Sequence, residues 1–503
     1  MKRLLAILLL ACLLAGCASK PDAYLPTGGG FDEDAVTSTP MQTPTDTELR
    51  LPYDKNGSFH PYTATDLNNR SLLSLVYQGL FAMNDSYEPT PILCKNYKVS
   101  ADMREWTFYL EDATFSDGQA VTAQDVITSL NTANASGFYA GRFRQVKSIS
   151  AGPDGSVVFS LNTPMNNLPL LLDVPILKAS QKNAAMPLGT GPYILEDTAD
   201  GKQLRRQMAW WCNAALPVGA QIIPLDHGTT QRELWDLYKF SGLSMVCTDA
   251  YVDFRGDYEL WESENGVFLY MTCNMKSKVF SDPGVRSALT FAIDRDTLVK
   301  KYYRGFAHSA TLPASPSFPS YSTTLAEKYA YQPEKFALAI TESNKAGSEI
   351  VLLVNRNDPL RLQTAQAIAE MLTAAGLVVT IPEVSDTDYY NKLKWGEFDL
   401  VLGQTKLSPN MDLTAFFGDK GSLNYGKITD VAAYNMSLDA LADSGNYQSL
   451  HKYVMDDGRL CPILVRSDAV YGRRGHFPGL SPSRDTIFYY TLGKTMADAK
   501  ITE

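Results

Sequence analysis

The 503-residue sequence lacks the motifs by which common catalytic sites are recognised. It contains no HExxH, GxSxG, GxGxxG or GxxxxGK[ST] pattern, so no zincin, nucleophile-elbow or nucleotide-loop signature is present. Histidine is scarce, and its five copies are isolated from one another: His60, His227, His308, His451 and His476. We therefore predict a protein that is not an enzyme, with no metal site and no cofactor.

The sequence also lacks an excess of positive charge and long apolar runs. Its net charge of −10 disfavours binding to nucleic acid and adhesion to anionic lipid through a basic surface. No apolar run of about twenty residues occurs, so no membrane-spanning helix is predicted. The N-terminus differs from the rest, because Lys2 and Arg3 precede an apolar run over residues 4–14. This pattern is typical of a signal peptide.

Residues 14–17 read Leu-Ala-Gly-Cys and resemble the bacterial lipobox. The resemblance implies that a signal peptide, residues 1–16, is removed and that Cys17 receives a lipid carrying acyl chains such as palmitate. An ordinary secretory signal with a chance cysteine is the alternative. Residues 17–46 are rich in Pro, Thr, Gly and Asp and are predicted to be a flexible linker. We expect an extracytoplasmic protein anchored to the bacterial cell membrane through Cys17.

Cysteine beyond this region is sparse and shows no CxxC pair. Five copies remain: Cys94, Cys212, Cys247, Cys273 and Cys461. An odd number in an exported protein leaves at least one free thiol. One or two disulfides among the others stay open, and metal binding by these residues is not expected.

The most informative stretch is residues 106–130. Alternation of apolar and polar side chains at residues 106–110 predicts a half-buried strand. Asp117-Gly118 predicts a turn, because glycine tolerates positive φ. Thr122 and Asp125 have capping-box spacing, so a helix is expected to begin there. The segment is therefore predicted to form a strand, a tight turn and a capped helix.

This stretch resembles the signature segment of extracellular solute-binding proteins of the oligopeptide and dipeptide class (family 5), which serve ABC importers. The blocks that carry the likeness are TFYL at 107–110, FSDG at 115–118 and TAQDV at 122–126. Further matching blocks lie in a helix predicted over 68–81, in GTGPY at 189–193, and in a spaced pattern over 274–294. Cys273 departs from the pattern, which has an aromatic residue there.

Residues 350–402 show regular alternation of strand and helix signals. An apolar run at 350–354 predicts a buried parallel strand. The following predictions are a helix over 364–375, a strand over 378–381, a helix over 389–395 and a strand over 398–402. This β-α-β-α-β order predicts a doubly wound α/β domain.

The family resemblance implies an α/β fold of the type II, cluster C-like periplasmic-binding-protein class. Two lobes form a clamp, with an extra α+β domain inserted in the first lobe. Lobe one would comprise residues 47–62, 177–272 and 462–503. The inserted domain would cover residues 63–176, and lobe two residues 273–461.

The resemblance also implies a ligand site. In the family, a carboxylate of lobe two pairs with the ligand's α-ammonium group and follows a strand that this chain matches at 396–402. The next carboxylate here is Asp412, in a loop beyond the C-terminal end of a strand, where α/β folds bind ligands. Its alternative role is to cap a helix over 413–417. Weaker candidates, with core or supporting roles as alternatives, are Gln404, Tyr270 and Asn274.

The function implied by the resemblance is capture of a short peptide between two lobes. Hinge closure would bury the peptide, and a monomeric protein would deliver it to the permease subunits of an ABC importer. One alternative is another solute on the same scaffold, such as a nickel complex, haem, an opine or an oligosaccharide. A second alternative is a non-transport role as a signal-peptide receptor or envelope chaperone.

Overall fold

The computed structural model describes residues 49–199, 201–212, 220–225, 231–240, 242–249, 258–477, 479–484 and 486–488. They all belong to one compact unit, Thr47–Glu503. The predicted signal peptide, lipidated Cys17 and linker lie outside the described residues, so these remain predictions. Among the helices that the structure describes, none is long and apolar enough to cross a membrane.

A first sheet contains four strands in the order β1-β10-β9-β8. Their bounds are Leu49–Asp54, Ala220–Leu225, Gly201–Arg206 and Tyr193–Thr198. β1 and β10 run parallel, and the other pairs are antiparallel. Helix α2 (Leu67–Val76) packs against β1 and β8 and begins at Asp66, whose side chain caps it. The strand predicted to start at Tyr193 is confirmed as β8.

Helix α2 ends at Val76, short of the predicted end at residue 81. The GTGPY segment explains this early end, because its glycines press against the last carbonyl groups of the helix. A Cβ atom on Gly191 would lie 2.5 Å from the carbonyl oxygen of Leu75. The Gly191 N–H donates to the Val76 carbonyl at 2.9 Å, so this loop takes a bond that another helical turn would need.

A second, antiparallel sheet contains four strands in the order β4-β5-β7-β6. Their bounds are Cys94–Val99, Glu105–Leu110, Val157–Leu161 and Val146–Ala151, and a short hairpin precedes them, β2 (Phe81–Met83) with β3 (Pro89–Pro91). The predicted strand, turn and helix are confirmed. Gly118 has a φ of +81°, and Thr122 and Asp125 form both halves of a capping box at helix α3 (Ala123–Asn134).

The third sheet has seven strands, six of them in the order β11-β17-β12-β16-β14-β15, with β13 paired to β17. Their bounds in that order are Met245–Asp249, Leu460–Gly472, Glu259–Cys273, Leu400–Lys406, Glu349–Val354, Val378–Thr380 and, for β13, Ala307–Ser309. β14 runs parallel to both β15 and β16, as the β-α-β-α-β pattern predicted. The other pairs are antiparallel, so the parallel part is limited to three strands.

The remaining α-helices of the described residues lie between β10 and β17 in the chain. They are α4 (Gln231–Phe240), α5 (Pro283–Ala288), α6 (Arg295–Tyr302), α7 (Thr323–Glu327), α8 (Pro333–Glu342), α9 (Pro359–Ala374), α10 (Asp386–Trp395), α11 (Thr414–Phe417), α12 (Val431–Ala442) and α13 (Tyr447–Asp457). Asp282 and Asp294 cap α5 and α6, as predicted. The predicted helices over 364–375 and 389–395 are confirmed within α9 and α10.

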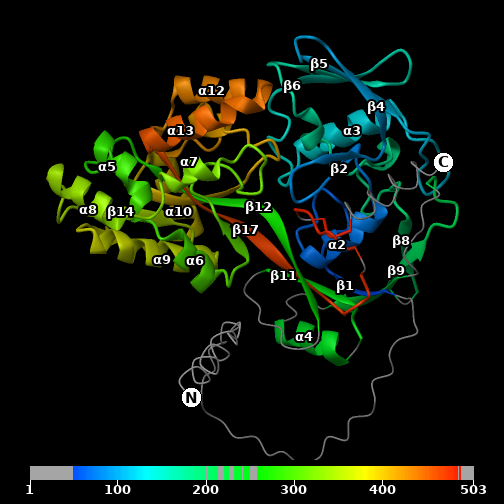
Figure 1. Cartoon of the computed structure of the whole chain (residues 1–503). Helices are drawn as coiled ribbons and strands as arrows, with labels where there is room; N and C mark the ends of the chain where they lie inside the picture. The colour runs from blue at the N-terminus through cyan, green and yellow to red at the C-terminus, as the bar shows by residue number, and fades with distance from the viewer. Residues whose placement is uncertain are drawn as a thin grey trace, which may run out of the picture. The chain divides into compact units, whose positions relative to one another are not determined.

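Strands β12 and β17 are the longest in the third sheet and lie side by side (Figure 1). Their register shifts between Glu264 and Phe268 and again between Leu269 and Tyr270. Gly266 lies in the first shift with a φ of +71°, a conformation that suits glycine. The pairing of the two strands is therefore irregular near the middle of β12.

A small apolar core lies beside this bulge. Tyr87 and Leu170, from the chain around the second sheet, share it with Phe268 and Tyr447. The Tyr87 ring meets the Phe318 ring edge-on at a centroid distance of 5.6 Å. This core joins segments around the second sheet to β12 and β17 of the third, near the cavity described next.

Candidate ligand-binding site

A cavity of about 110 Å³, called here the cleft, opens between three segments that are distant in sequence. It is bounded by residues 138–144, by residues 405–423 and by Arg484. A neighbouring cavity of about 620 Å³ shares four lining residues with the cleft: Ala140, Gly141, Arg144 and Ser422. A third, of about 40 Å³, also shares four: Phe138, Tyr139, Arg142 and Arg484.

Two of the three segments follow regular elements. Residues 138–144 lie between α3 and β6, and residues 407–413 follow β16, the strand that pairs with both β12 and β14. The side-chain amide of Gln145 donates to the Thr414 hydroxyl at 3.3 Å across the two segments. The cleft therefore lies beyond the C-terminal end of a strand that has a parallel neighbour, the place where α/β folds bind ligands.

Asp412 lines the cleft, and its side chain is 6% exposed. One carboxylate oxygen accepts the Thr414 N–H at 2.8 Å, at the start of α11, which matches the alternative capping role. The other oxygen lies 3.7 Å from the Arg144 guanidinium, too far for a hydrogen bond. That oxygen can still accept a hydrogen bond from a ligand's ammonium group.

Gln404 and Tyr270 lie on neighbouring strands near the cleft but do not line it. Gln404 is on β16, and its side-chain oxygen is buried without a hydrogen-bond partner among the described residues. Tyr270 is fully buried against Phe416, with a ring centroid distance of 5.0 Å, and burial raises the pKa of its hydroxyl. Gly403 leaves room for this ring, since a Cβ there would lie 2.7 Å from it.

Asn274 lies at the end of β12 with its side chain fully engaged by backbone. Its amide nitrogen donates to the carbonyls of Gly396 and Phe398, at 2.8 and 2.7 Å. Its amide oxygen accepts the Lys276 N–H at 3.0 Å. These bonds tie the end of β12 to the turn before β16, and they leave Asn274 a supporting place beside the sheet.

Arg484 is one of the lining residues that the sequence did not predict. It is 5% exposed, and one terminal nitrogen donates to the Leu407 carbonyl at 3.0 Å. The other terminal nitrogen, Nη1, has no hydrogen-bond partner within the ranges given above. Gly266 leaves space for this guanidinium, because a Cβ on Gly266 would lie 2.5 Å from Arg484 Nη2.

The charges that line the cleft are mostly positive. Of its five charged residues, four are basic, Arg142, Arg144, Lys406 and Arg484, and one is acidic, Asp412. Two aromatic rings carry cations on their faces: the Lys406 ammonium lies 4.1 Å from the Phe138 ring centroid, and the Arg142 guanidinium lies 5.1 Å from that of Tyr139. This local excess of positive charge contrasts with the chain's net charge of −10.

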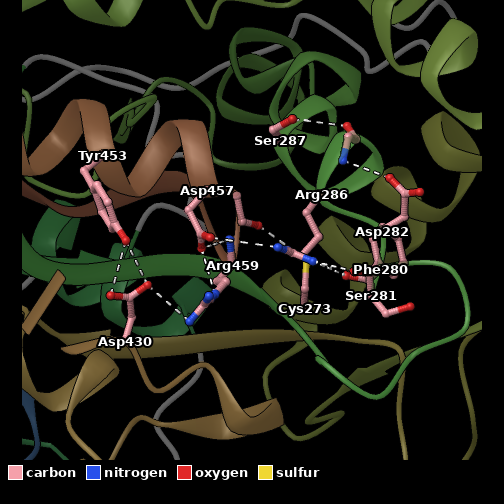
Figure 2. A network of polar contacts seen from close by, with 12 residues as sticks. Cys273, Phe280, Ser281, Asp282, Arg286, Ser287, Asp430, Tyr453, Asp457 and Arg459 are labelled. Carbon is pink, nitrogen blue, oxygen red and sulfur yellow. Dashed lines mark hydrogen bonds and ion pairs between the residues drawn. The ribbon is translucent and has the colours of Figure 1, made fainter. Parts of the chain in front are cut away.

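Figure 2 shows a second polar network, whose residues are not among those that line the cleft. Arg459 is 3.0 Å from Asp457 and 3.2 Å from Asp430, while Arg286 is 3.9 Å from Asp457. The Tyr453 hydroxyl donates to Asp430 at 3.2 Å, and Asp430 also caps α12. Because its acidic and basic groups neutralise one another, we interpret this network as structural.

The described residues offer no metal site, since no group of three or more potential ligands gathers among them. Cys247, Cys273 and Cys461 are buried free thiols. Burial raises the pKa of the Cys247 thiol to about 12, so it is not a reactive thiolate at neutral pH.

Residues 88–227 and 236–424 match the family model described as "Bacterial extracellular solute-binding proteins, family 5 Middle". The glutathione-binding protein GsiB of Pectobacterium atrosepticum is 25% identical over 344 residues, 64% of this chain. The match covers 66% of that relative's length, slightly under two thirds.

Two solved structures of similar proteins share the fold. The oligopeptide-binding protein AppA from Bacillus subtilis, in complex with a nonapeptide, aligns with a TM-score of 0.63 and 19% identity over 89% of this chain and 98% of its own. NikZ from Campylobacter jejuni, in complex with Ni(L-His), aligns with a TM-score of 0.65 and 16% identity over 89% of this chain and 99% of its own.

Proposed function

The chain belongs to the bacterial extracellular solute-binding proteins of family 5, and we propose that it captures a short peptide for an ABC importer. Membership in this family confirms the resemblance identified in the sequence, and the structural likenesses confirm the predicted type II periplasmic-binding-protein fold. As part of this proposal, the chain works with an ABC permease and catalyses no reaction itself; its place in the family supports both points. The identity of the solute is the proposal.

One observation carries the peptide proposal: a single cleft presents both a carboxylate and guanidinium groups. A peptide is zwitterionic, so it has an ammonium for Asp412 and a carboxylate for a basic residue. Charge-assisted hydrogen bonds of this kind are short, strong and directional. The relative named for glutathione, a tripeptide, and the structure that holds a nonapeptide support the same ligand class.

The proposed mechanism is hinge closure about β12 and β17. The cleft is bounded on one side by residues 138–144 and on the other by residues 405–423, so a ligand there touches both. A ligand that makes these contacts only when the two sides meet shifts the equilibrium toward the closed state. Closed protein with bound peptide is the form that permease subunits would receive.

We keep the predicted domain division as part of this proposal. Lobe one comprises residues 47–62, 177–272 and 462–503, the inserted domain residues 63–176, and lobe two residues 273–461. The boundary between the lobes then falls at the C-terminal end of β12 and the N-terminal end of β17. Small-angle scattering with and without added peptide checks the closure, because the radius of gyration is expected to fall on binding.

We also propose that the protein works as a monomer tethered to the cell membrane by lipid on Cys17. The signal-peptide pattern and the Leu-Ala-Gly-Cys sequence support this. Intact mass spectrometry of detergent-extracted protein checks it, since loss of residues 1–16 and a gain of acyl mass are expected. A mass equal to the unmodified chain would contradict the anchor.

The direct test of the peptide proposal is the substitution Asp412→Asn. It keeps the side chain's shape and its acceptor for the Thr414 N–H, and it removes the charge that would pair with an ammonium group. We expect affinity for free-amine tripeptides to fall at least tenfold by calorimetry, with little change in melting temperature. Asp112→Asn, at an exposed position outside the cleft lining, is the matched control. Equal affinity in Asp412→Asn and wild type would remove Asp412 from the site.

A further inference from the structure

We propose that Arg484 is a specificity-determining residue that pairs with a carboxylate of the bound peptide. This inference rests on the proposed function and deepens it, because it names the chemical group that the cleft selects. A peptide offers that group at its C-terminus or on an acidic side chain. A ligand that lacks a carboxylate would leave the arginine without a counter-ion.

The first argument is the burial of an incompletely bonded charge. Arg484 is 5% exposed, yet its Nη1 group has no hydrogen-bond partner in the described part of the chain. The Nη2 group of the same guanidinium donates to the Leu407 carbonyl. A guanidinium has five N–H donors and cannot lose its charge in a protein. A buried charge that stays unpaired is costly, so a ligand anion at this position would be strongly favoured.

The second argument concerns Glu264, a buried carboxylate that bonds to Tyr87. One of its oxygens accepts the Tyr87 hydroxyl, and the other accepts the Ser315 hydroxyl at 2.6 Å. The ring centroid of Tyr87 lies 5.9 Å from the guanidinium carbon of Arg484. No ion pair within 4 Å links Arg484 to any carboxylate of the described residues. The charge of Arg484 is therefore available to a ligand.

The third argument is that the surroundings prepare a place for an anion. Ser408 lines the same cleft, and its hydroxyl is buried without a partner among the described residues, so it can donate to a carboxylate. Arg142 and Arg144 are each beside an aspartate, Asp173 and Asp412, and still keep the cleft basic overall. A guanidinium with a neighbouring hydroxyl is a donor pair suited to a planar carboxylate.

The fourth argument is the bulge in β12. Gly266 has a φ of +71°, and a Cβ there would lie 2.5 to 3.0 Å from all three terminal guanidinium atoms of Arg484. The guanidinium thus occupies space that only glycine leaves open. Ser263 donates its hydroxyl to the Arg484 carbonyl at 2.6 Å, which fixes the backbone of the same residue. The strand and the arginine form one preorganised unit.

The experiment offers the wild-type full chain four pools of tripeptides by equilibrium dialysis, with retained peptides quantified by mass spectrometry. The pools have neutral or acid-containing side chains, each made with a free C-terminus or a C-terminal amide. Retention of the neutral free-acid pool at least tenfold above the neutral amide pool assigns Arg484 to the terminal carboxylate. Retention of the acidic amide pool tenfold above the neutral amide pool assigns it to a side-chain carboxylate.

The remaining outcomes overturn the inference and separate it from the proposed function. Equal retention of all four pools would refute carboxylate selection, and peptide capture would stand. Retention of none would refute peptide capture itself, and this inference would fall with it. Each result is read on the wild-type protein, so none depends on a variant that folds.

Substitutions then assign the selectivity to the residue. Arg484→Met is expected to bring the free-acid to amide ratio close to one, and Arg484→Lys to restore at least part of it. A merely structural arginine would instead lower the melting temperature and reduce retention of every pool by the same factor. Arg206→Met, at an exposed position on β9, is the control and is expected to keep the wild-type ratio. A wild-type ratio in Arg484→Met would refute the assignment.

Discussion

Lowering the pH from 7 to 5 is expected to destabilise the protein through one buried histidine, His451. This residue lies on α13 with 0% of its surface exposed, and its ring centroid is 5.8 Å from that of Tyr447. Neither ring nitrogen has a hydrogen-bond partner among the described residues. A protonated ring would therefore be both desolvated and unbonded, and burial lowers the pKa of His451 from 6.5 to about 3.

The magnitude follows from proton linkage. In the unfolded chain His451 binds a proton below about pH 6.5, whereas in the folded protein it stays neutral down to about pH 3. Between these values the unfolded state binds more protons, so stability is complete above pH 6.5 and is lost as the pH falls. At pH 5 the loss corresponds to about 1.5 pKa units, or about 2 kcal/mol.

Urea denaturation at pH 7 and pH 5, followed by tryptophan fluorescence, measures this loss. His451→Leu removes the titrating ring and keeps an apolar side chain, so its stability is expected to fall by about 2 kcal/mol less than that of wild type between the two pH values. Carboxylates titrate alike in both proteins and cancel in this difference. His60→Gln is the control, because both His60 ring nitrogens have hydrogen-bond partners. Equal losses in wild type and His451→Leu would refute the reasoning.

Two further predictions test the crossing strands and the second polar network. Gly266→Ala is expected to lower stability by about 1–3 kcal/mol and to reduce tripeptide retention, since it strains a φ of +71° and displaces Arg484. Gly305→Ala is the control for backbone strain alone, because Gly305 has a φ of +88° and open space around it. Equal losses of stability and of tripeptide retention in the two variants would contradict the displacement of Arg484. Arg459→Met is expected to cost about 3 kcal/mol in chemical denaturation, because it removes the ion-pair partner of Asp430 and the nearer of the two arginines beside Asp457 (Figure 2). Lys452→Met, which breaks an exposed pair, is expected to cost under about 1 kcal/mol, and a similar cost for both would show that the network is not needed.

The elements that sequence predicted well are those whose signals are local. The capping box of Thr122 and Asp125 and the N-caps at Asp282 and Asp294 each lie within one helical turn, so four neighbouring residues suffice to recognise them. The alternation of residues 106–110 likewise reports one half-buried face. These signals need no knowledge of the rest of the chain, and the structure confirms all of them.

The boundaries that sequence missed are set by distant partners. β16 begins at Leu400 and continues to Lys406, beyond the predicted end at residue 402, because residues 403–406 pair with residues 267–270 of β12. Similarly, β12 starts at Glu259, eight residues before the apolar stretch that begins at Val267. Its first half carries polar side chains and pairs with β17, a contact about 200 residues away in sequence that no local pattern records.

The candidate site, like the fold, was predictable only where its residues carry a local signal. Asp412, which the family resemblance proposed and which follows a strand end, lines the cleft, and its part in binding stays a prediction. Arg142 and Arg144 lie in a stretch that combines arginine with aromatic residues. Such a stretch is a local signal for a basic binding surface. Arg484 had no signal at all, because its place depends on the bulge at Gly266 and on the Leu407 carbonyl, which lie 218 and 77 positions away in the chain.

An arginine placed in this way links binding to folding. Its guanidinium is desolvated by the bulge and by Tyr87, and the described residues supply it with one carbonyl acceptor. The unliganded protein therefore bears an electrostatic cost that the unfolded chain does not, because an exposed guanidinium is hydrated. A carboxylate that pairs with Arg484 removes this cost, so the bound state gains stability by mass action and by relief of an unfavourable charge. Sequences depart from the local rules of folding mainly at functional sites. The glycine bulge and the incompletely bonded arginine are two such departures, and they occur together beside the cleft.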